Sequence, residues 1–297
     1  MKIGLVGLGK MGLHLALNLR DHGHEVVGMD RDKRLAEALT SRGGQSAETL
    51  EQLVDALPRP RTVWVMVPSG AVQSVVSELA ELLAEGDRII DGGNSFYKDS
   101  VRLGGECAKK NIHFLDVGTS GGMEGARSGA CMMIGGNRAA FEPLEPLFAD
   151  LCVPDGYLYA GPSGSGHFLK MIHNGIEYGM MQAIGEGFEL LVKSDYEFDL
   201  PNVAKVWSNG SVIRGWLMEL TERALSKDAK LDGIQGVMHS SGEGLWTVET
   251  ALELQAAVPV MAMSLMMRYR SQESDTFHGK VVSALRAEFG GHSVMKS

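Results

Sequence analysis

Four polar side chains near the middle of the chain have the types and spacing that acid–base chemistry needs. They stand at i, i+3, i+4 and i+7 and are Lys170, His173, Asn174 and Glu177. Because an α-helix turns by about 100° per residue, these positions share one helix face, with Tyr178 at its edge. A solvated stripe usually consists of Lys, Glu and Arg, whereas this face combines an amine, an imidazole, an amide and a carboxylate. We therefore interpret it as a catalytic face and not as a surface network.

An amine and a carboxylate on one face suit the oxidation and decarboxylation of a hydroxy acid. A lysine can take the hydroxyl proton during hydride transfer when desolvation and neighbouring cations lower the lysine pKa towards neutrality. If the new ketone is β to a carboxylate, CO2 can leave while the protonated lysine polarises the ketone. The resulting enediol needs a proton at carbon, which a carboxylic acid can give. Lys170 and Glu177 fit these two roles, and the chemistry needs no metal ion.

A glycine-rich loop near the start of the chain predicts a dinucleotide site. The loop follows a run typical of a buried strand and precedes a helical pattern, which is the context that gives GxGxxG its meaning. Gly7 allows a tight turn, Gly9 lets the backbone approach a pyrophosphate, and Gly12 lets helix and strand pack closely. The N–H groups at the start of the helix then face the phosphates. The expected cofactor-binding residues of the loop are Gly7, Leu8, Gly9, Lys10, Met11 and Gly12.

The residues after the second predicted strand favour NAD as the cofactor. Asp30 lies 18 residues after Gly12, where an acid accepts a hydrogen bond from the adenosine ribose 2′-hydroxyl. The same carboxylate would repel a 2′-phosphate. Arg31 argues the other way, because an arginine there can stack on adenine or pair with that phosphate. NAD is therefore expected, with NADP as the weaker alternative.

The order of apolar runs predicts two domains. In the first half, short apolar runs alternate with amphipathic ones, which is typical of a parallel sheet with helices on both faces. After a Gly/Pro/Ser cluster at 161–166, only helical patterns follow. The predicted fold is an α/β Rossmann domain with a doubly wound, mainly parallel sheet over residues 1–163, followed by an all-α domain over residues 164–297.

The expected elements can be stated by residue range. Strands are predicted at 2–6, 25–30, 62–67, 88–91, 113–116, 131–134 and 157–160. Helices of the first domain are predicted at 11–22, 33–41 and 72–83. Helices of the second domain are predicted at 165–193, 201–225, 230–237, 244–268 and 273–288.

Composition and charge limit the classes of function. The chain has 297 residues, of which 44% are hydrophobic and 22% charged, and these values fit a globular protein of about two domains. The net charge of −9 argues against a nucleic-acid partner. The most apolar stretch, 258–267, is too short to span a bilayer, and the first residues form a strand pattern instead of a signal peptide. Three widely spaced cysteines indicate reduced thiols and no zinc site, so we expect a cytoplasmic protein without membrane or metal.

These motifs, with three others, resemble those of 6-phosphogluconate dehydrogenase in its short form. The matching segments are GLGKMG at 7–12, DGGN at 91–94, SGG at 120–122, KMIHNGIEYG at 170–179 and an R-x-x-F-G-x-H pattern at 286–292. The SGG and KMIHNGIEYG segments together are quite specific. The resemblance implies oxidative decarboxylation of 6-phospho-D-gluconate to D-ribulose 5-phosphate and CO2 with reduction of NAD, as in the pentose phosphate pathway.

The resemblance also implies roles for the matching residues. Lys170 would be the general base and Glu177 the general acid. The sugar acid and its carboxylate would be held by Asn94, Ser120, Gly121, Gly122, His173, Asn174 and Tyr178. The nicotinamide side of the cofactor would be lined by Val67 and Pro68, with Asn94 in contact with cofactor as well as substrate.

Cations from the end of the chain would complete the site. Arg270 would bind the substrate phosphate, with Arg268 as the rival assignment. Arg286 and His292 would reach the site of a neighbouring subunit. The resemblance therefore implies a homodimer or homotetramer whose active sites are shared between subunits, with a sugar-acid phosphate as the small-molecule partner.

The sequence departs from the long form of the family in several places. It lacks the second half of the larger helical domain. A KGTGKWT-like segment becomes SGEGLWT at 241–247, so that Ser241 and Glu243 replace a lysine and a threonine near the phosphate. Met123 stands where the family often has an acid. An NADP-type Asn-Arg-Thr becomes Asp-Arg-Asp at 30–32, which strengthens the expectation of NAD.

Two alternative functions stay open. The chain is also similar to other β-hydroxyacid dehydrogenases, such as 3-hydroxyisobutyrate dehydrogenase, which share the cofactor loop, an SGG-like turn and the lysine–asparagine pair. Those enzymes need no decarboxylation acid and do not usually have His173, Glu177, Tyr178 or the motif at 286–292. A non-catalytic dinucleotide sensor is disfavoured, because such proteins commonly lose the catalytic lysine that this chain keeps as Lys170.

Overall fold

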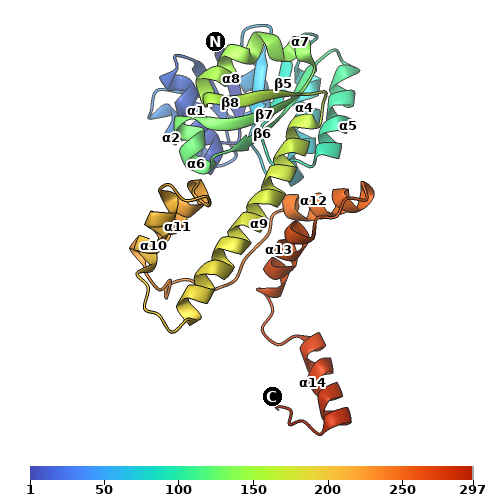
Figure 1. The fold of residues 1–297 in the computed structure, drawn as a ribbon. Helices are drawn as coiled ribbons and strands as arrows, with labels where there is room; N and C mark the ends of the chain where they lie inside the picture. The colour runs from blue at the N-terminus through green and yellow to red at the C-terminus, as the bar shows by residue number, and fades with distance from the viewer. Residues whose placement is uncertain (296–297) are drawn as a thin grey trace. The chain divides into compact units, whose positions relative to one another are not determined.

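The first half of the chain folds around a single eight-stranded sheet (Figure 1). In this computed structural model, which describes residues 1–295, the strand order is β3-β2-β1-β4-β5-β6-β7-β8. Strands β1 to β6 pair in parallel, β7 is antiparallel to β6, and β8 is parallel to β7. The strands are β1 Lys2–Val6, β2 Glu25–Met29, β3 Gln45–Ser46, β4 Thr62–Val65, β5 Arg88–Asp91, β6 His113–Ser120, β7 Ala130–Gly136 and β8 Cys152–Gly161.

Helices connect these strands and cover both faces of the sheet (Figure 1). They are α1 Lys10–Asp21, α2 Lys33–Thr40, α3 Leu50–Asp55, α4 Ser69–Leu82, α5 Tyr97–Ala108, α6 Gly122–Ser128, α7 Arg138–Phe141 and α8 Glu145–Leu151, with the short 3-10 helix Glu142–Leu144 between the last two. Val63, Trp64 and Val65 of β4 are all fully buried. Central strands of a doubly covered sheet are apolar on both sides, so this burial is the expected consequence of the two helical layers.

The topology makes β1 and β4 the point where the chain changes direction across the sheet. From β1 the chain proceeds outward to β2 and β3, and it then returns to β4 on the other side of β1. Ligands of open α/β sheets bind outside the carboxyl ends of the strands at such a switch point. Here Met66 N donates to Val6 O at 2.7 Å, and Gly7 N donates to Met29 O at 2.8 Å. The glycine-rich loop therefore starts at the switch point.

The predicted Rossmann domain and helical domain are confirmed. All seven predicted strands are present, and β1 and β5 have the predicted bounds. The sequence pattern missed β3 and the helices α3 and α5 to α8. Most of these elements are short, and a helix such as α6, which contains two glycines, carries little periodic signal.

The chain divides into two compact units, Met1–His173 and Asn174–Ser297. The division falls inside α9, which runs unbroken over Ser165–Lys193 as predicted. The domain boundary expected from sequence, at 163/164, lies just before this helix. The later helices are α10 Leu200–Ser208, α11 Trp216–Lys227, α12 Gly242–Glu253, α13 Pro259–Arg270 and α14 Phe277–Gly290. Up to residue 295, no strand follows β8.

Three helix predictions in the second unit need correction. The helix predicted at 230–237 is wrong, because Asp228 accepts hydrogen bonds from Lys230 N and Gly233 N and Leu231 has a φ of 53°. The helix predicted at 201–225 is split between α10 and α11 by glycine-containing turns. The helix predicted at 244–268 is split between α12 and α13, because Pro259 begins a new helix.

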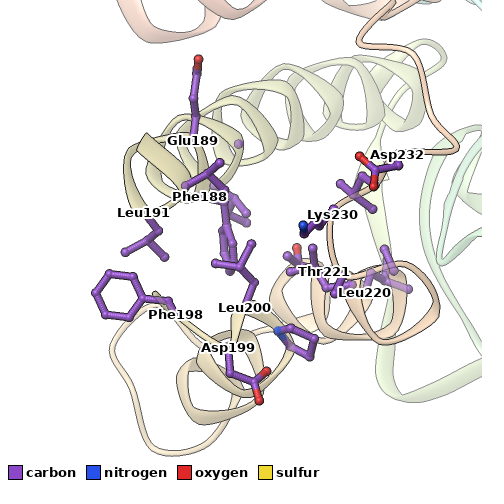
Figure 2. A pocket seen from close by; sticks show the side chains of 18 of the residues that line it. Phe188, Glu189, Leu191, Phe198, Asp199, Leu200, Leu220, Thr221, Lys230 and Asp232 are labelled. Atoms are coloured by element: carbon purple, nitrogen blue, oxygen red, sulfur yellow. The ribbon is translucent and has the colours of Figure 1, made fainter. Parts of the chain in front are cut away.

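The second unit leaves much apolar surface uncovered. A hollow of about 1330 Å³ lies between the end of α9, α10, α11 and residues 229–232 (Figure 2). Phe188 and Leu200 line it, while Glu189 and Asp199 stand on its border. Helix α14 has no buried residue. No residue of the expected substrate site lines the hollow, so it is a separate feature of the helical unit.

Over the described residues, no helix combines the length and the apolarity needed to cross a membrane.

Candidate active site

The glycine loop after β1 has the geometry that the sequence predicted for a dinucleotide site. Gly7 has a φ of 94°, and a Cβ added there would lie 2.5 Å from Met66 O. A Cβ at Gly12 would overlap Gly7 O, so close packing of α1 on the loop requires glycine. A Cβ at Gly9 would meet no atom within 4 Å, which leaves space for a ligand to approach the backbone.

The start of α1 suits an anionic ligand. Gly9 is the N-cap of α1, no side chain hydrogen-bonds to this cap, and the first turn has no acidic residue. The first N–H groups of a helix lack partners within the helix and attract phosphate oxygens. Lys10 is exposed and Met11 is half-buried, whereas Leu8 is fully buried in the core. The loop therefore presents backbone and one cation, and it fits the diphosphate of a dinucleotide.

Asp30, the acid expected to favour NAD over NADP, lies beside this loop. Asp30 Oδ2 accepts a hydrogen bond of 2.6 Å from Leu8 N, and its Oδ1 accepts one of 2.8 Å from Asp32 N. Asp32 caps α2 and pairs with Arg34 at 2.7 Å, and hydrogen bonds from Arg34 lower the pKa of the Asp32 carboxyl. Arg31 is exposed. Both carboxylates are thus held at the end of β2.

Val67 and Asn94 come from neighbouring strand ends. Val67 follows β4, and its Cγ1 would lie 3.1 Å from a Cβ at Gly7. The next residue, Pro68, is exposed and precedes α4. Asn94 is exposed in the loop after β5, where Asp91 accepts hydrogen bonds from Gly93 N at 3.1 Å and from Ser95 Oγ at 2.6 Å. A Cβ at Gly93 would lie 3.0 Å from Val67 O, so the two loops touch.

The SGG segment forms a tight turn between β6 and α6. Gly121 and Gly122 have φ values of 113° and 59°, a region that favours glycine. Ser120 ends β6, and its Oγ lies 3.1 Å from His173 Nε2. Two segments that are 53 residues apart in sequence thus bring together two predicted substrate residues.

Hydrogen bonds hold the start of helix α9 against β6. The fully buried carboxylate of Asp116 accepts hydrogen bonds from Gly164 N at 2.7 Å and from His167 N at 2.9 Å. A Cβ at Gly118 would overlap Lys170 Cβ, so the helix packs directly on the backbone of the strand. Lys170 is 7% exposed. The predicted base is therefore buried and fixed by contacts with the sheet.

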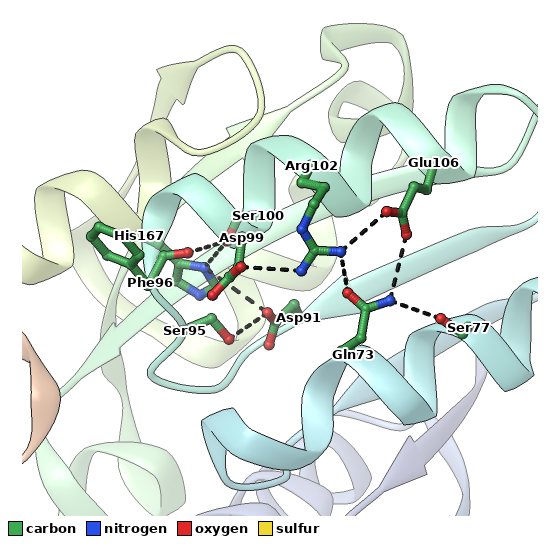
Figure 3. A network of polar contacts seen from close by, with 10 residues as sticks. All are labelled: Gln73, Ser77, Asp91, Ser95, Phe96, Asp99, Ser100, Arg102, Glu106 and His167. Carbon is green, nitrogen blue, oxygen red and sulfur yellow. Dashed lines mark hydrogen bonds and ion pairs between the residues drawn. The ribbon is translucent and has the colours of Figure 1, made fainter.

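A buried polar network supports the same region, and sequence reasoning missed it (Figure 3). His167 Nδ1 lies 2.7 Å from Ser100 Oγ and 4.0 Å from Asp91 Oδ2. His167, Ser100 and Asp91 are each at most 1% exposed. The network joins the Asn94 loop to the helix turn that precedes Lys170. The only sequence signal was the DGGN motif, because His167 lies 67 residues from Ser100 and 76 residues from Asp91.

The helical unit supplies a second set of predicted residues. Asn174 and Tyr178 are buried, and Glu177 is half-buried. Asn174 Nδ2 donates to Glu243 Oε1 at 3.2 Å. Because α9 is one continuous helix, Lys170, His173, Asn174 and Glu177 share a face as predicted.

The two candidate phosphate arginines differ in their surroundings. The guanidinium of Arg268 lies 3.6 Å from the centre of the Tyr178 ring, and its Nη1 donates to His239 O at 2.8 Å. Arg270 is exposed and donates to Glu273 O. Arg286, on α14, and His292, which follows it, are both exposed. Within this chain, the contact with a predicted substrate residue is made by Arg268.

The fold and the glycine loop define a Rossmann-type dinucleotide-binding protein. Residues 2–155 match the family model described as the NAD binding domain of 6-phosphogluconate dehydrogenase, and residues 166–292 match the model of that enzyme's C-terminal domain. The chain therefore belongs to the 6-phosphogluconate dehydrogenase family of oxidoreductases. The match confirms the predicted NAD-binding domain.

Individual relatives agree with this assignment. The chain is 60% identical over 296 residues to YqeC of Bacillus subtilis (strain 168), which is provisionally named a 6-phosphogluconate dehydrogenase, and 100% of both chains is covered. It is 41% identical over 299 residues to an NAD(+)-dependent, decarboxylating 6-phosphogluconate dehydrogenase of Haloferax volcanii, covering 100% of this chain and 99% of the relative. A solved 6-phosphogluconate dehydrogenase of Plasmodium falciparum matches with a TM-score of 0.85 and 30% identity, covering 100% of this chain and 66% of that one.

Proposed function

We propose that the protein oxidises 6-phospho-D-gluconate and decarboxylates it to D-ribulose 5-phosphate and CO2, with NAD as the acceptor of the hydride. The observation that carries the proposal is the buried Lys170 on an α9 face that also presents Glu177. The chain's 41% identity to the Haloferax enzyme, whose name states NAD dependence and decarboxylation, supports it.

In this proposal the two ionisable residues act in sequence. Lys170 takes the proton of the substrate hydroxyl as NAD accepts the hydride, and its ammonium then polarises the ketone while the C–C bond to the carboxylate breaks and CO2 leaves. The electron pair of that bond forms an enolate, which takes the proton back from the Lys170 ammonium to give an enediol. Glu177 then gives a proton to the terminal carbon while Lys170 removes the enediol hydroxyl proton, which leaves the ketose. The proton taken from the hydroxyl balances the proton given to carbon, so NADH, CO2 and the ketose phosphate account for all atoms.

The remaining polar residues would bind and orient the substrate. The 3.1 Å contact between Ser120 Oγ and His173 supports a shared role of the SGG turn and α9 in holding the sugar acid. Asn94 and Asn174 would contact its polar groups, and Tyr178 would lie beside its distal end. For the phosphate, the stacking of Arg268 on Tyr178 favours Arg268 over Arg270.

The proposal includes self-association. Phe277 and Phe289 of α14 are 80% and 78% exposed, and large exposed apolar side chains on one helix mark an interaction surface. Arg286 and His292 would then contribute to the substrate site of a neighbouring subunit. The assembly would be a homodimer or a homotetramer.

NAD is preferred over NADP in this proposal because two carboxylates stand at the end of β2. A 2′-phosphate placed beside Asp30 would meet negative charge, whereas a ribose 2′-hydroxyl can donate to it. The opposing cation, Arg31, is exposed. We expect kcat/KM with NAD to exceed that with NADP by about tenfold or more.

Steady-state kinetics test the proposal directly. Purified protein is assayed with NAD and with NADP against 6-phosphogluconate, D-gluconate and 3-hydroxyisobutyrate, with NADH or NADPH and CO2 both measured. We expect equal amounts of NADH and CO2 from 6-phosphogluconate. NADH without CO2, or turnover of 3-hydroxyisobutyrate alone, would contradict the decarboxylating function. The Glu177→Gln variant separates the same alternatives, since undiminished turnover would favour a simple β-hydroxyacid dehydrogenase.

A further inference from the structure

Glu243 carries a buried carboxylate with one oxygen that lacks a hydrogen-bond partner. The residue is 3% exposed and lies in the first turn of α12. Its Oε1 accepts the 3.2 Å hydrogen bond from Asn174 Nδ2, whereas its Oε2 is buried and has no partner among the described residues. A buried charged acceptor without a donor is costly. The carboxylate is therefore suited to a donor that a ligand brings.

Close packing of α12 on α9 fixes this carboxylate beside residues of the proposed substrate site. A Cβ at Gly244 would lie 2.5 Å from the Tyr178 ring, and one at Gly175 would lie 2.7 Å from a side-chain atom of α12. The two helices thus approach to the distance that only glycine allows. These contacts hold the backbone at the start of α12, and with it the backbone of Glu243, against α9.

The charge of Glu243 changes what the start of α12 can bind. The first turn of a helix ordinarily attracts phosphate, because its N–H groups and its dipole favour negative charge. Here the Glu243 carboxylate already supplies that negative charge, and it would repel a phosphate dianion at short range. The cation available to a phosphate is instead Arg268, which is stacked on Tyr178.

We propose that Glu243 is a specificity-determining residue for the substrate. Its unpaired oxygen accepts a hydrogen bond from a hydroxyl group on the carbon chain of a sugar acid, and its charge excludes phosphate from the start of α12. The ligand class is a polyhydroxylated carboxylic acid, because such a molecule carries hydroxyl donors on several successive carbons. The inference rests on the sugar-acid oxidation proposed above and adds that Glu243 recognises a hydroxyl group of the substrate.

The test compares the wild type with Glu243→Gln at saturating NAD. Glutamine keeps the shape and can still accept from Asn174, but it removes the charge and one acceptor. We expect the KM for D-gluconate to rise about tenfold, with kcat changed by less than about twofold. For 6-phosphogluconate, the lost hydroxyl contact is offset by the removed repulsion of its phosphate, so the ratio of kcat/KM for 6-phosphogluconate to that for gluconate should rise about tenfold. An unchanged ratio in the folded variant overturns the proposal.

Binding of inorganic phosphate, measured by isothermal titration, gives a readout that does not depend on turnover. Glu243→Gln should bind phosphate about tenfold more tightly than the wild type, because the repulsion is removed. If the wild type oxidises neither acid, the proposed function fails, and this measurement alone decides the role of Glu243. Equal phosphate affinities of wild type and variant then overturn it.

Two further variants separate specificity from structure. Glu249→Gln makes the same charge change at an exposed position of α12 and should leave both the kinetic ratio and the phosphate affinity unchanged. Glu243→Asp keeps the charge but shortens the side chain, so the KM for both sugar acids should rise about tenfold while phosphate affinity stays constant. If Glu243→Gln fails to fold, an unchanged KM in Glu243→Asp overturns the proposal.

Discussion

Lys170 owes its position to β6 as much as to its own helix. Gly118 lets the strand backbone come into contact with Lys170 Cβ, and the Asp116 carboxylate two residues earlier in the strand holds the first turn of α9. A base on a rigid element keeps its reactive atom within the narrow range that proton transfer needs. Lys170 is therefore buried, and its backbone is held in place by contacts with β6.

Replacing Lys170 by methionine should abolish turnover and leave cofactor binding intact. Methionine has a similar length but no amine, so the hydroxyl proton has no acceptor, and we expect kcat to fall by about 10²–10⁴-fold. The glycine loop is unchanged, so NAD affinity measured by fluorescence titration should stay close to that of the wild type. Lys193→Met, at the exposed end of the same helix, is the matched control. Loss of NAD binding in a folded Lys170→Met protein would show that the lysine has another role.

At the scale of elements, α9 depends on a cap supplied from far away in sequence. Asp116 lies 48 and 51 residues before the two N–H groups that it accepts from, and it is fully buried. Most helices are capped by a residue next to their first turn. A remote cap makes the start of α9 depend on the sheet, so that the helix and β6 are expected to order together.

Asp116→Asn should lower stability measurably. The amide has one acceptor oxygen instead of two and places N–H donors against a backbone N–H, so we expect a loss of about 1–3 kcal/mol in the free energy of unfolding. Urea denaturation followed by circular dichroism measures it. Asp99→Asn, which breaks an exposed pair with Arg102, should cost less than about 1 kcal/mol. Equal effects of the two substitutions would contradict the capping role of Asp116.

At the scale of the whole molecule, the helical unit of a single chain leaves most of its large apolar residues unburied. Few large apolar residues of this unit are buried, and α14 contributes none of them. Burial of apolar surface is the main favourable term in folding and association. The exposed apolar residues of α14 thus favour a partner, and we expect that partner to be a second copy of the chain.

Removal of residues 277–297 should therefore reduce both assembly and activity. We expect a smaller mass in light scattering after gel filtration and a fall in kcat/KM of about 10²-fold, because the truncation removes Arg286 and His292, which we propose to contribute to the neighbouring site. NAD affinity should change little, since the glycine loop is untouched. Arg286→Ala is the matched control, and it should lower kcat/KM without changing the mass. Unchanged mass and kinetics after truncation would rule out the proposed role of the tail.

Prediction from the sequence was most successful for elements that depend on residues close together in the chain. The strand–loop–helix at the start of the chain, the alternation that predicts the Rossmann sheet, and the extent of α9 depend on periodicity and on glycines within a few residues. The helix predicted at 230–237 failed because Asp228 closes a turn there, and an apolar pattern alone does not distinguish such a turn from a short helix. The predictions of unbroken helices at 201–225 and 244–268 failed because glycine-containing turns separate α10 from α11 and because Pro259 begins a new helix.

By itself, the sequence determined the class of fold, the cofactor loop and the residues of one helix face, since all three follow from short-range spacing. Tertiary structure decided how those residues are held. The capping of α9 by Asp116, the contact between His167 and Ser100, and the bond between Asn174 and Glu243 join residues 48 to 69 positions apart. Such contacts exist only after the chain has folded, because no local pattern specifies which distant partner a buried polar group will meet.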